Sequence, residues 1–202
     1  MCPAVWPPKW RGYPARPFSF SAVSMGYLSF NRPPKNWNRT QKTLPMRVIV
    51  NTSPLIVLDR IGKLGLLREL YRTIVRPQSV LTELQAGAPR FRVSTELLES
   101  SWIVTEPDPP EMSLRRELGE GETAVITLAF KTQADLVIID DLQARLVAES
   151  LGIALTGTLG VLCAGHDFGK IPDLKSTIQQ VQEAGFYISE DVLGTMLKKH
   201  QS

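Results

Sequence analysis

Short apolar runs alternate with longer stretches of helical period along the chain from residue 47 onward. The two clearest runs, residues 47–50 and 136–139, consist mainly of valine, isoleucine and leucine. A strand that is apolar on both faces is typical of a parallel sheet covered by helices, because a strand with one face in water alternates polar and apolar residues. Weaker runs follow at residues 73–75, 102–104 and 153–155. The sequence therefore predicts an α/β fold, a three-layer domain with a central parallel sheet flanked by helices.

Helix signals separate the predicted strands. Ser53 is a candidate N-cap with Pro54 at the first helical position, and Gly62 closes that helix. The later helices are predicted at residues 64–71, 77–87, 93–100 and 121–131, after Asp141 and through residue 151, and at 158–168, 174–185 and 189–199. In such sheets ligands gather outside the carboxyl ends of the strands.

Residues 1–45 differ in composition from the rest of the chain. They hold eight of the 15 prolines, eight of the 15 aromatic residues and seven Lys or Arg, but no Asp or Glu. Such a segment is predicted to be extended or disordered, and it is compatible with a transit peptide or a basic arm for nucleic acid. We favour a third interpretation, in which Met46 is the true initiator. The predicted division is a leader at residues 1–45 and a domain at residues 46–202.

Composition excludes several classes of protein. The 43% hydrophobic content supplies a core, and the 202 residues suffice for one domain with an extension. Cys2 and Cys163 fit neither a zinc site nor a disulfide scaffold, and two histidines supply a histidine-based site poorly. No apolar run approaches the length of a membrane span, so we expect no membrane partner and a reducing, cytoplasmic location.

Acidic or amide side chains follow two strands and interrupt two helical faces. Asn51 ends the first strand, and Asp140 with Asp141 ends the run at 136–139. Glu122 leads the apolar face of its helix, and Glu83 lies at the margin of another. Carboxylates supplied by separate elements suit a hard cation such as Mg²⁺, which prefers oxygen ligands.

Each of these residues also has a structural interpretation, which stays open at this point. Glu122 could favour a helix N-terminus through the macrodipole. Asp140 could be an N-cap, Asp141 could pair with Arg145 four residues on, and Glu83 could be a solvated rim residue.

The domain resembles the PIN-domain family, and in particular small prokaryotic PIN-like proteins similar to the VapC toxins. The resemblance is carried, in order and spacing, by residues 49–56, 77–84, 118–124, 136–141, 144–145 and 156–160. It implies a site for Mg²⁺ or Mn²⁺ at Asn51, Glu83, Glu122 and the Asp140–Asp141 pair, with Asp141 favoured over Asp140. Glu83, Glu122 and Asp141 would be the catalytic carboxylates. Asn51 departs from the family, since active PIN nucleases usually place Asp there, although the resembled subgroup commonly has Asn.

The resemblance implies metal-assisted hydrolysis of RNA phosphodiester bonds. Ser53, Arg145 and Thr158 are the candidate nucleic-acid contacts, although such hydroxyl residues more often cap helices and Arg145 could instead neutralise Asp141. Arg68, Arg72 and Arg76 are candidates for a basic RNA-binding patch, although such arginines more often lie on an ordinary solvated surface.

The resemblance also implies candidate partners. They are RNA, a small antitoxin if the protein is the toxin of a toxin–antitoxin pair, and a second copy in a homodimer. Leu193, Met196 and Leu197 could form the dimer contact or could equally well pack in the core.

Two functions other than that of a nuclease have some support in the sequence. One is a catalytically weak or inactive PIN-fold module that binds nucleic acid or a protein partner, which the neutral Asn51 favours. The other is dinucleotide binding, since residues 119–124 match a G-x-G-x-x-A pattern. Residues 113–118, which precede it, are polar and do not resemble a strand, so the second is rejected.

Overall fold

Five parallel strands form the centre of the computed structural model, which describes residues 46–110, 118–186 and 188. The strands are β1 (Val48–Val50), β2 (Ile74–Pro77), β3 (Ile103–Glu106), β4 (Leu136–Ile138) and β5 (Leu155–Thr156). Their order across the sheet is β3-β2-β1-β4-β5, and each neighbouring pair is parallel. The predicted parallel sheet is confirmed.

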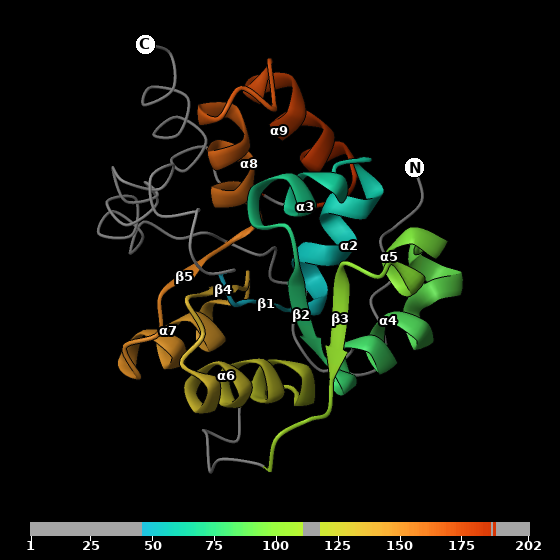
Figure 1. Ribbon diagram of the computed structural model, residues 1–202. Coiled ribbons are helices and arrows are strands. Elements are labelled where there is room, and N and C mark those ends of the chain that lie inside the picture. Colours follow the sequence, from blue (N-terminus) through green and yellow to red (C-terminus); the bar gives the residue numbers. More distant parts are fainter. Residues whose placement is uncertain (1–45, 111–117, 187, 189–202) are drawn as a thin grey trace.

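Helices cover the two faces of this sheet (Figure 1). Helices α6 and α7 lie together on one side, and α2, α3, α8 and α9 gather on the other. Helices α4 and α5 pack beside β2 and β3. The bounds are α2 (Thr52–Arg60), α3 (Gly65–Tyr71), α4 (Gln78–Phe91), α5 (Thr95–Glu99), α6 (Glu120–Thr132), α7 (Leu142–Ser150), α8 (Thr158–Asp167) and α9 (Leu174–Glu183). The three-layer arrangement predicted from the sequence is therefore confirmed.

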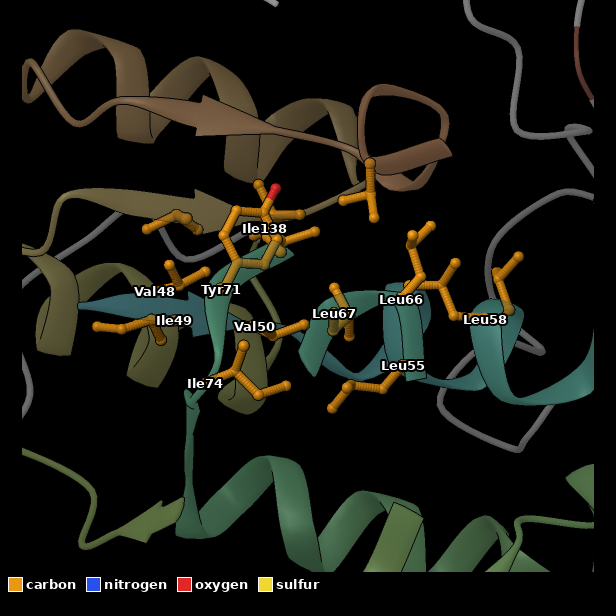
Figure 2. Close-up of a cluster of buried hydrophobic side chains, with 14 of the residues drawn as sticks. Val48, Ile49, Val50, Leu55, Leu58, Leu66, Leu67, Tyr71, Ile74 and Ile138 are labelled. Carbon is orange, nitrogen blue, oxygen red and sulfur yellow. The ribbon is translucent and has the colours of Figure 1, made fainter. Parts of the chain in front are cut away.

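The core lies between the sheet and its helices. The three residues of β1 are fully buried, because β1 is central in the sheet and helices cover both of its faces. Figure 2 shows Val50 of β1, Ile74 of β2 and Leu67 of α3 in one cluster of buried side chains. Each fully buried side chain of this kind contributes about 1.5–3 kcal/mol relative to an exposed one. This packing fixes where the ends of the strands lie.

Four local boundaries differ from the sequence prediction. Helix α2 begins at Thr52 with Asn51 as its N-cap, so Ser53 and Pro54 lie inside its first turn. The prediction of Ser53 as N-cap was wrong. Proline lacks a backbone N–H, and a residue in the first turn of a helix has no intrahelical acceptor for one, so Pro54 is tolerated at any first-turn position and does not fix the N-cap. Strand β2 extends to Pro77, and α4 continues beyond Gly87 to Phe91. Strand β5 begins at Leu155, later than predicted.

Two predicted segments lie outside the described residues, namely the leader at 1–45 and the helix at 189–199. Among the described residues, no helix is both long and apolar enough to cross a membrane.

Candidate functional site

The candidate site lies where the sheet changes the direction of its connections. The chain leaves β1 toward β2 and β3 on one side, while β4 and β5 lie on the other side. The backbone N–H of Asn51 donates to the carbonyl of Ile138 at 3.0 Å, so the ends of β1 and β4 are joined at this point. Such a switch point at the carboxyl ends of parallel strands is the usual place for a ligand.

Asn51 is the N-cap of α2, but its side chain does not cap that helix. The residue is 1% exposed, and its Nδ2 lies 3.5 Å from Oε1 of Glu122. Within the described part of the chain, its Oδ1 has no hydrogen-bond donor. An N-cap asparagine normally accepts from its own helix, and a buried acceptor without a donor costs about 1–3 kcal/mol. The carbonyl oxygen of Asn51 is therefore available to a ligand.

Glu122 and Glu83 both lie against the first turn of α6. Glu122 is 8% exposed, and its carboxylate folds back over Gly119, where a Cβ atom would lie only 2.1 Å from Oε2. Glu83 comes from α4, and its carboxylate lies against Gly121. Asn51 at the N-cap of α2, Glu83 of α4 and Glu122 of α6 are thus placed near one another, and their role in a shared site stays a prediction.

Thr52 is a residue that the sequence analysis missed. Its Oγ1 donates to Oε2 of Glu83 at 2.7 Å and ties the start of α2 to α4. Thr52 follows the candidate ligand Asn51 at a helix start, and that adjacency is the signal that could have singled it out. Ser53, the hydroxyl residue that the sequence predicts as a nucleic-acid contact, is half-buried in the same helical turn.

Asp140 and Asp141 point to two different helices. Asp140 accepts from the backbone N–H of Thr158 at 2.8 Å and from its hydroxyl at 2.5 Å, and so holds the start of α8. Asp141 is the N-cap of α7, and its Oδ1 accepts from the N–H of Ala144 at 2.8 Å. Both carboxylates of the pair are therefore engaged with a helix N-terminus.

Arg145 of α7 lies beside Asp140, at the end of β4. Its Nη1 donates to the carbonyl of Ile139 at 3.1 Å, and a Cβ atom at Gly157 would meet both this nitrogen and Asp140. Burial raises the pKa of Asp140, while Thr158 and the positive charge of Arg145 oppose the rise. The charge of Arg145 thus acts on Asp140, and Asp141 adds to the rise as a neighbouring negative charge.

The described side chains form two half-sites. One contains Asn51, Glu122, Glu83 and Thr52, and the other contains Asp140 with Thr158 and Arg145. Among the described residues, no three Asp, Glu, His or Cys side chains converge closely enough to hold a metal ion between them. The oxygens available to a ligand are nevertheless carboxylate and amide oxygens, and Asn51 Oδ1 has no donor within the described ranges, so the first half-site fits a hard divalent cation.

Arg76 does not belong to an RNA-binding patch. It is 2% exposed, and its guanidinium donates to the carbonyls of Leu97 and Leu98 at 2.6 and 2.7 Å and to Thr105 Oγ1 at 3.0 Å. Burial lowers its pKa. The prediction for Arg76 was wrong because a side chain in strand β2 points into the protein, whereas Arg68 and Arg72 are exposed.

The glycines of the G-x-G-x-x-A pattern face carboxylates. Gly119 lies under Glu122 and Gly121 under Glu83, so negative charge occupies the place where a dinucleotide would bring its diphosphate. This arrangement agrees with the rejection of a dinucleotide site.

Known proteins match the chain to different extents. Aerobic glycerol-3-phosphate dehydrogenases from Staphylococcus epidermidis and Staphylococcus aureus are 31% identical over 130 residues and 26% identical over 131 residues. Each match covers 56% of this chain but only 23% of the relative, so the chain spans less than a quarter of their length. A solved PilT N-terminus domain protein from the archaeon Sulfolobus solfataricus P2 is 15% identical with a TM-score of 0.43, over 59% of this chain and 92% of that chain.

A family model gives the broadest match. The model of DUF3368, which is described as a PIN domain, matches residues 47–202 and thus more than half of the chain. PIN domains are generally nucleases that use divalent metal ions. The chain belongs to this PIN-domain family.

Proposed function

We propose that the protein is a metal-dependent ribonuclease of the PIN type. The observation that carries the proposal is the buried Oδ1 of Asn51, which has no donor among the described residues. The amide nitrogen of the same side chain, Nδ2, lies 3.5 Å from Oε1 of Glu122. A hard cation satisfies an oxygen of this kind and offsets the negative charge of the nearby glutamates. The position at the switch point and the membership in the PIN family support the same conclusion.

Asn51 and Glu122 are the residues that would hold Mg²⁺ or Mn²⁺, with Glu83 beside them. When bound, such an ion lowers the pKa of water and stabilises charge on a phosphate. Glu83 accepts a hydrogen bond from the hydroxyl of Thr52, which holds its carboxylate in place at the start of α2. Asp140 and Asp141 complete the acidic set at the end of β4, where each is held by a helix N-terminus.

The proposed nucleic-acid contacts differ in their surroundings. Thr158 is buried and gives its N–H and hydroxyl to Asp140, and Arg145 donates to Ile139, so both support the β4 end of the site. Ser53 is half-buried at the start of α2, one residue beyond Thr52. Ser53 is therefore the hydroxyl that we expect to meet a phosphate or a metal-bound water.

A nuclease assay tests the proposal. We expect purified protein to cleave RNA when Mg²⁺ or Mn²⁺ is added, and Glu122→Gln and Asp141→Asn to abolish that cleavage. Glu99→Gln is the matched control, because Glu99 is an exposed glutamate on α5 outside the site. Cleavage that survives both site substitutions would come from a contaminant, and the proposal would then be abandoned.

A catalytically weak module that binds nucleic acid or a protein partner is the second candidate. It is favoured by Asn51, because a neutral amide contributes no charge to a cation site and is a poor general base. Tight binding of RNA by wild-type protein that does not cleave it, in the presence of Mn²⁺, would support this candidate.

The toxin role, the small antitoxin and the homodimer stay predictions that rest on the resemblance. We expect a toxin to arrest growth on expression, and a small protein encoded beside it to relieve the arrest. Harmless expression of an enzyme with demonstrated cleavage would count against that role. The residues suggested for a dimer, Leu193, Met196 and Leu197, lie outside the described part of the chain.

A further inference from the structure

The carboxylate of Glu83 lies flat against the Cα of Gly121. A Cβ atom at residue 121 would be 3.0 Å from Oε2 and 3.1 Å from both Cδ and Oε1 of Glu83, a tight contact from which the carboxylate would have to move by a few tenths of an ångström. On its other side, Oε2 of Glu83 accepts from Thr52 Oγ1 at 2.7 Å. The carboxylate is therefore held between the first residue of α2 and the first turn of α6.

Backbone conformation does not explain the glycine at position 121. Positive φ angles occur at Gly62, Gly152, Gly169 and Gly185 among the described glycines, and Gly121 is not among them. Glycine within a helix is less favourable than alanine, because it loses more conformational freedom on folding. The space that Gly121 leaves for Glu83 is a physical reason for this unfavourable choice in α6.

Gly119 does the same for Glu122. It is the N-cap of α6, and a Cβ atom there would overlap Oε2 of Glu122 at 2.1 Å. The two glycines alternate with two glutamates in the sequence Gly119-Glu120-Gly121-Glu122. Each glycine thus makes room for one carboxylate of the first half-site.

We propose that Gly119 and Gly121 are positioning residues, whose missing side chains set the places of Glu122 and Glu83 on the first turn of α6. This inference rests on the proposed function for its consequence, which is the affinity of the site for a divalent ion. The placement of the two glutamates by the glycines can be measured without any ion. Failure of the positioning and failure of the metal site can therefore be told apart.

The test uses Gly121→Ala in two backgrounds. In the wild-type background we expect the added methyl group to displace Glu83 and to lower the melting temperature by about 3 °C. In a chain of this length, a modest steric destabilisation shifts the melting temperature by a few degrees. In the Glu83→Ala background the carboxylate is gone, so the same substitution should raise the melting temperature through the better helix propensity of alanine. Gly65→Ala is the matched control, because Gly65 begins α3 and has open space around it.

Binding of Mn²⁺, followed by electron paramagnetic resonance, is the second measurement. We expect Gly121→Ala to weaken binding about tenfold, as substitutions behind a metal ligand commonly do, and Gly65→Ala to leave it unchanged. Equal melting shifts for Gly121→Ala in both backgrounds would overturn the inference. So would wild-type Mn²⁺ affinity in Gly121→Ala. A third outcome separates the two parts: the melting shift of Gly121→Ala depends on Glu83, but the wild type binds no Mn²⁺. That outcome would uphold the role of Gly121 in positioning Glu83 and would reject the proposed metal site.

Discussion

Asp140 receives two hydrogen bonds from Thr158, one from the backbone N–H and one from the hydroxyl, at 2.8 and 2.5 Å. The two residues are 18 positions apart in the chain, and their hydrogen bonds join the segment after β4 to the start of α8. Because Gly157, the N-cap of α8, has no side chain, Asp140 supplies the acceptor for this helix N-terminus.

Thr158→Val removes the hydroxyl and keeps the shape of the side chain. Asp140 then loses one of its two charge-assisted hydrogen bonds, so we expect the free energy of unfolding to fall by about 2 kcal/mol. Urea denaturation measures this change. Thr127→Val is the matched control, because Oγ1 of Thr127 is buried and has no partner among the described residues. The control should be as stable as wild type or more so, and equal losses in both variants would contradict the assignment.

Gly157→Ala tests the space between Asp140 and Arg145. A Cβ atom at residue 157 would lie 2.7 Å from Asp140 Oδ1 and 2.9 Å from Arg145 Nη1. Overpacking of this kind costs about 1–3 kcal/mol, which thermal denaturation can detect. The φ angle of Gly157 is −118°, so backbone strain does not contribute. A variant as stable as Gly65→Ala would show that the Asp140 and Arg145 side chains move aside at little cost.

Arg76→Met is expected to be strongly destabilising. Methionine fills part of the volume but leaves the carbonyls of Leu97 and Leu98 and the hydroxyl of Thr105 without the donors that Arg76 supplies. Buried groups of this kind cost about 1–3 kcal/mol each, so we expect a loss of at least about 3 kcal/mol. Arg68→Met, at an exposed position in α3, should stay within about 0.5 kcal/mol of wild type. Guanidinium chloride denaturation compares the two variants.

The sheet could be predicted because its central strands are apolar at every position and are separated by helical periods. Asn51, Glu83 and Glu122 could be grouped because strand ends and helix starts meet at one edge of such a sheet. The contact between Thr52 and Glu83 could not, because it depends on how α2 and α4 converge across 31 positions of the chain.

The different roles of the neighbours Asp140 and Asp141 also could not be predicted from the sequence. Their carboxylates diverge because Asp141 turns to cap its own helix while Asp140 turns to α8. Sequence spacing is the same for both arrangements, so it could not assign the roles of the pair. For the same reason the burial of Arg76 was missed, since an alternating strand position can face either water or the core.

Tyr71 should make the protein sensitive to alkaline pH. Burial raises the pKa of Tyr71 well above its usual value of 10.0. As pH rises above 10, the unfolded chain loses this proton while the folded protein keeps it, so the unfolded state binds fewer protons and stability falls. One proton corresponds to about 1.4 kcal/mol per pH unit. We expect Tyr71→Phe to reduce the slope of unfolding free energy against pH above 10 by that amount. Identical slopes would show that the phenol ionises freely in the folded protein.

Asn51→Asp places a full negative charge beside Glu122. Without a divalent ion the two carboxylates repel each other, so we expect the variant to be less stable than wild type in the presence of a chelator. With Mn²⁺ the extra charge becomes a ligand, and affinity should rise by roughly tenfold, equivalent to about 1.4 kcal/mol. Calorimetric titration with Mn²⁺ measures the affinity, and melting curves with and without the ion measure the stability.

Asn51→Ala and Asn51→Asp together separate the role of the oxygen from the role of the charge. Asn51→Ala removes Oδ1, a buried acceptor without a donor in the part of the chain that the structure describes, so it should relieve the cost of that acceptor in the ion-free protein and weaken Mn²⁺ binding. If Asn51 Oδ1 is a ligand, the affinity order is Asp above Asn above Ala, while the stability order in chelator places Asp lowest. An affinity that does not change across the three residues would place any ion away from the end of β1. RNA cleavage by Asn51→Asp at a higher rate than wild type would then identify the neutral amide as the feature that limits catalysis in this chain, since the substitution keeps an oxygen at position 51 and replaces the amide nitrogen, which donates to Glu122, with a charged carboxylate oxygen.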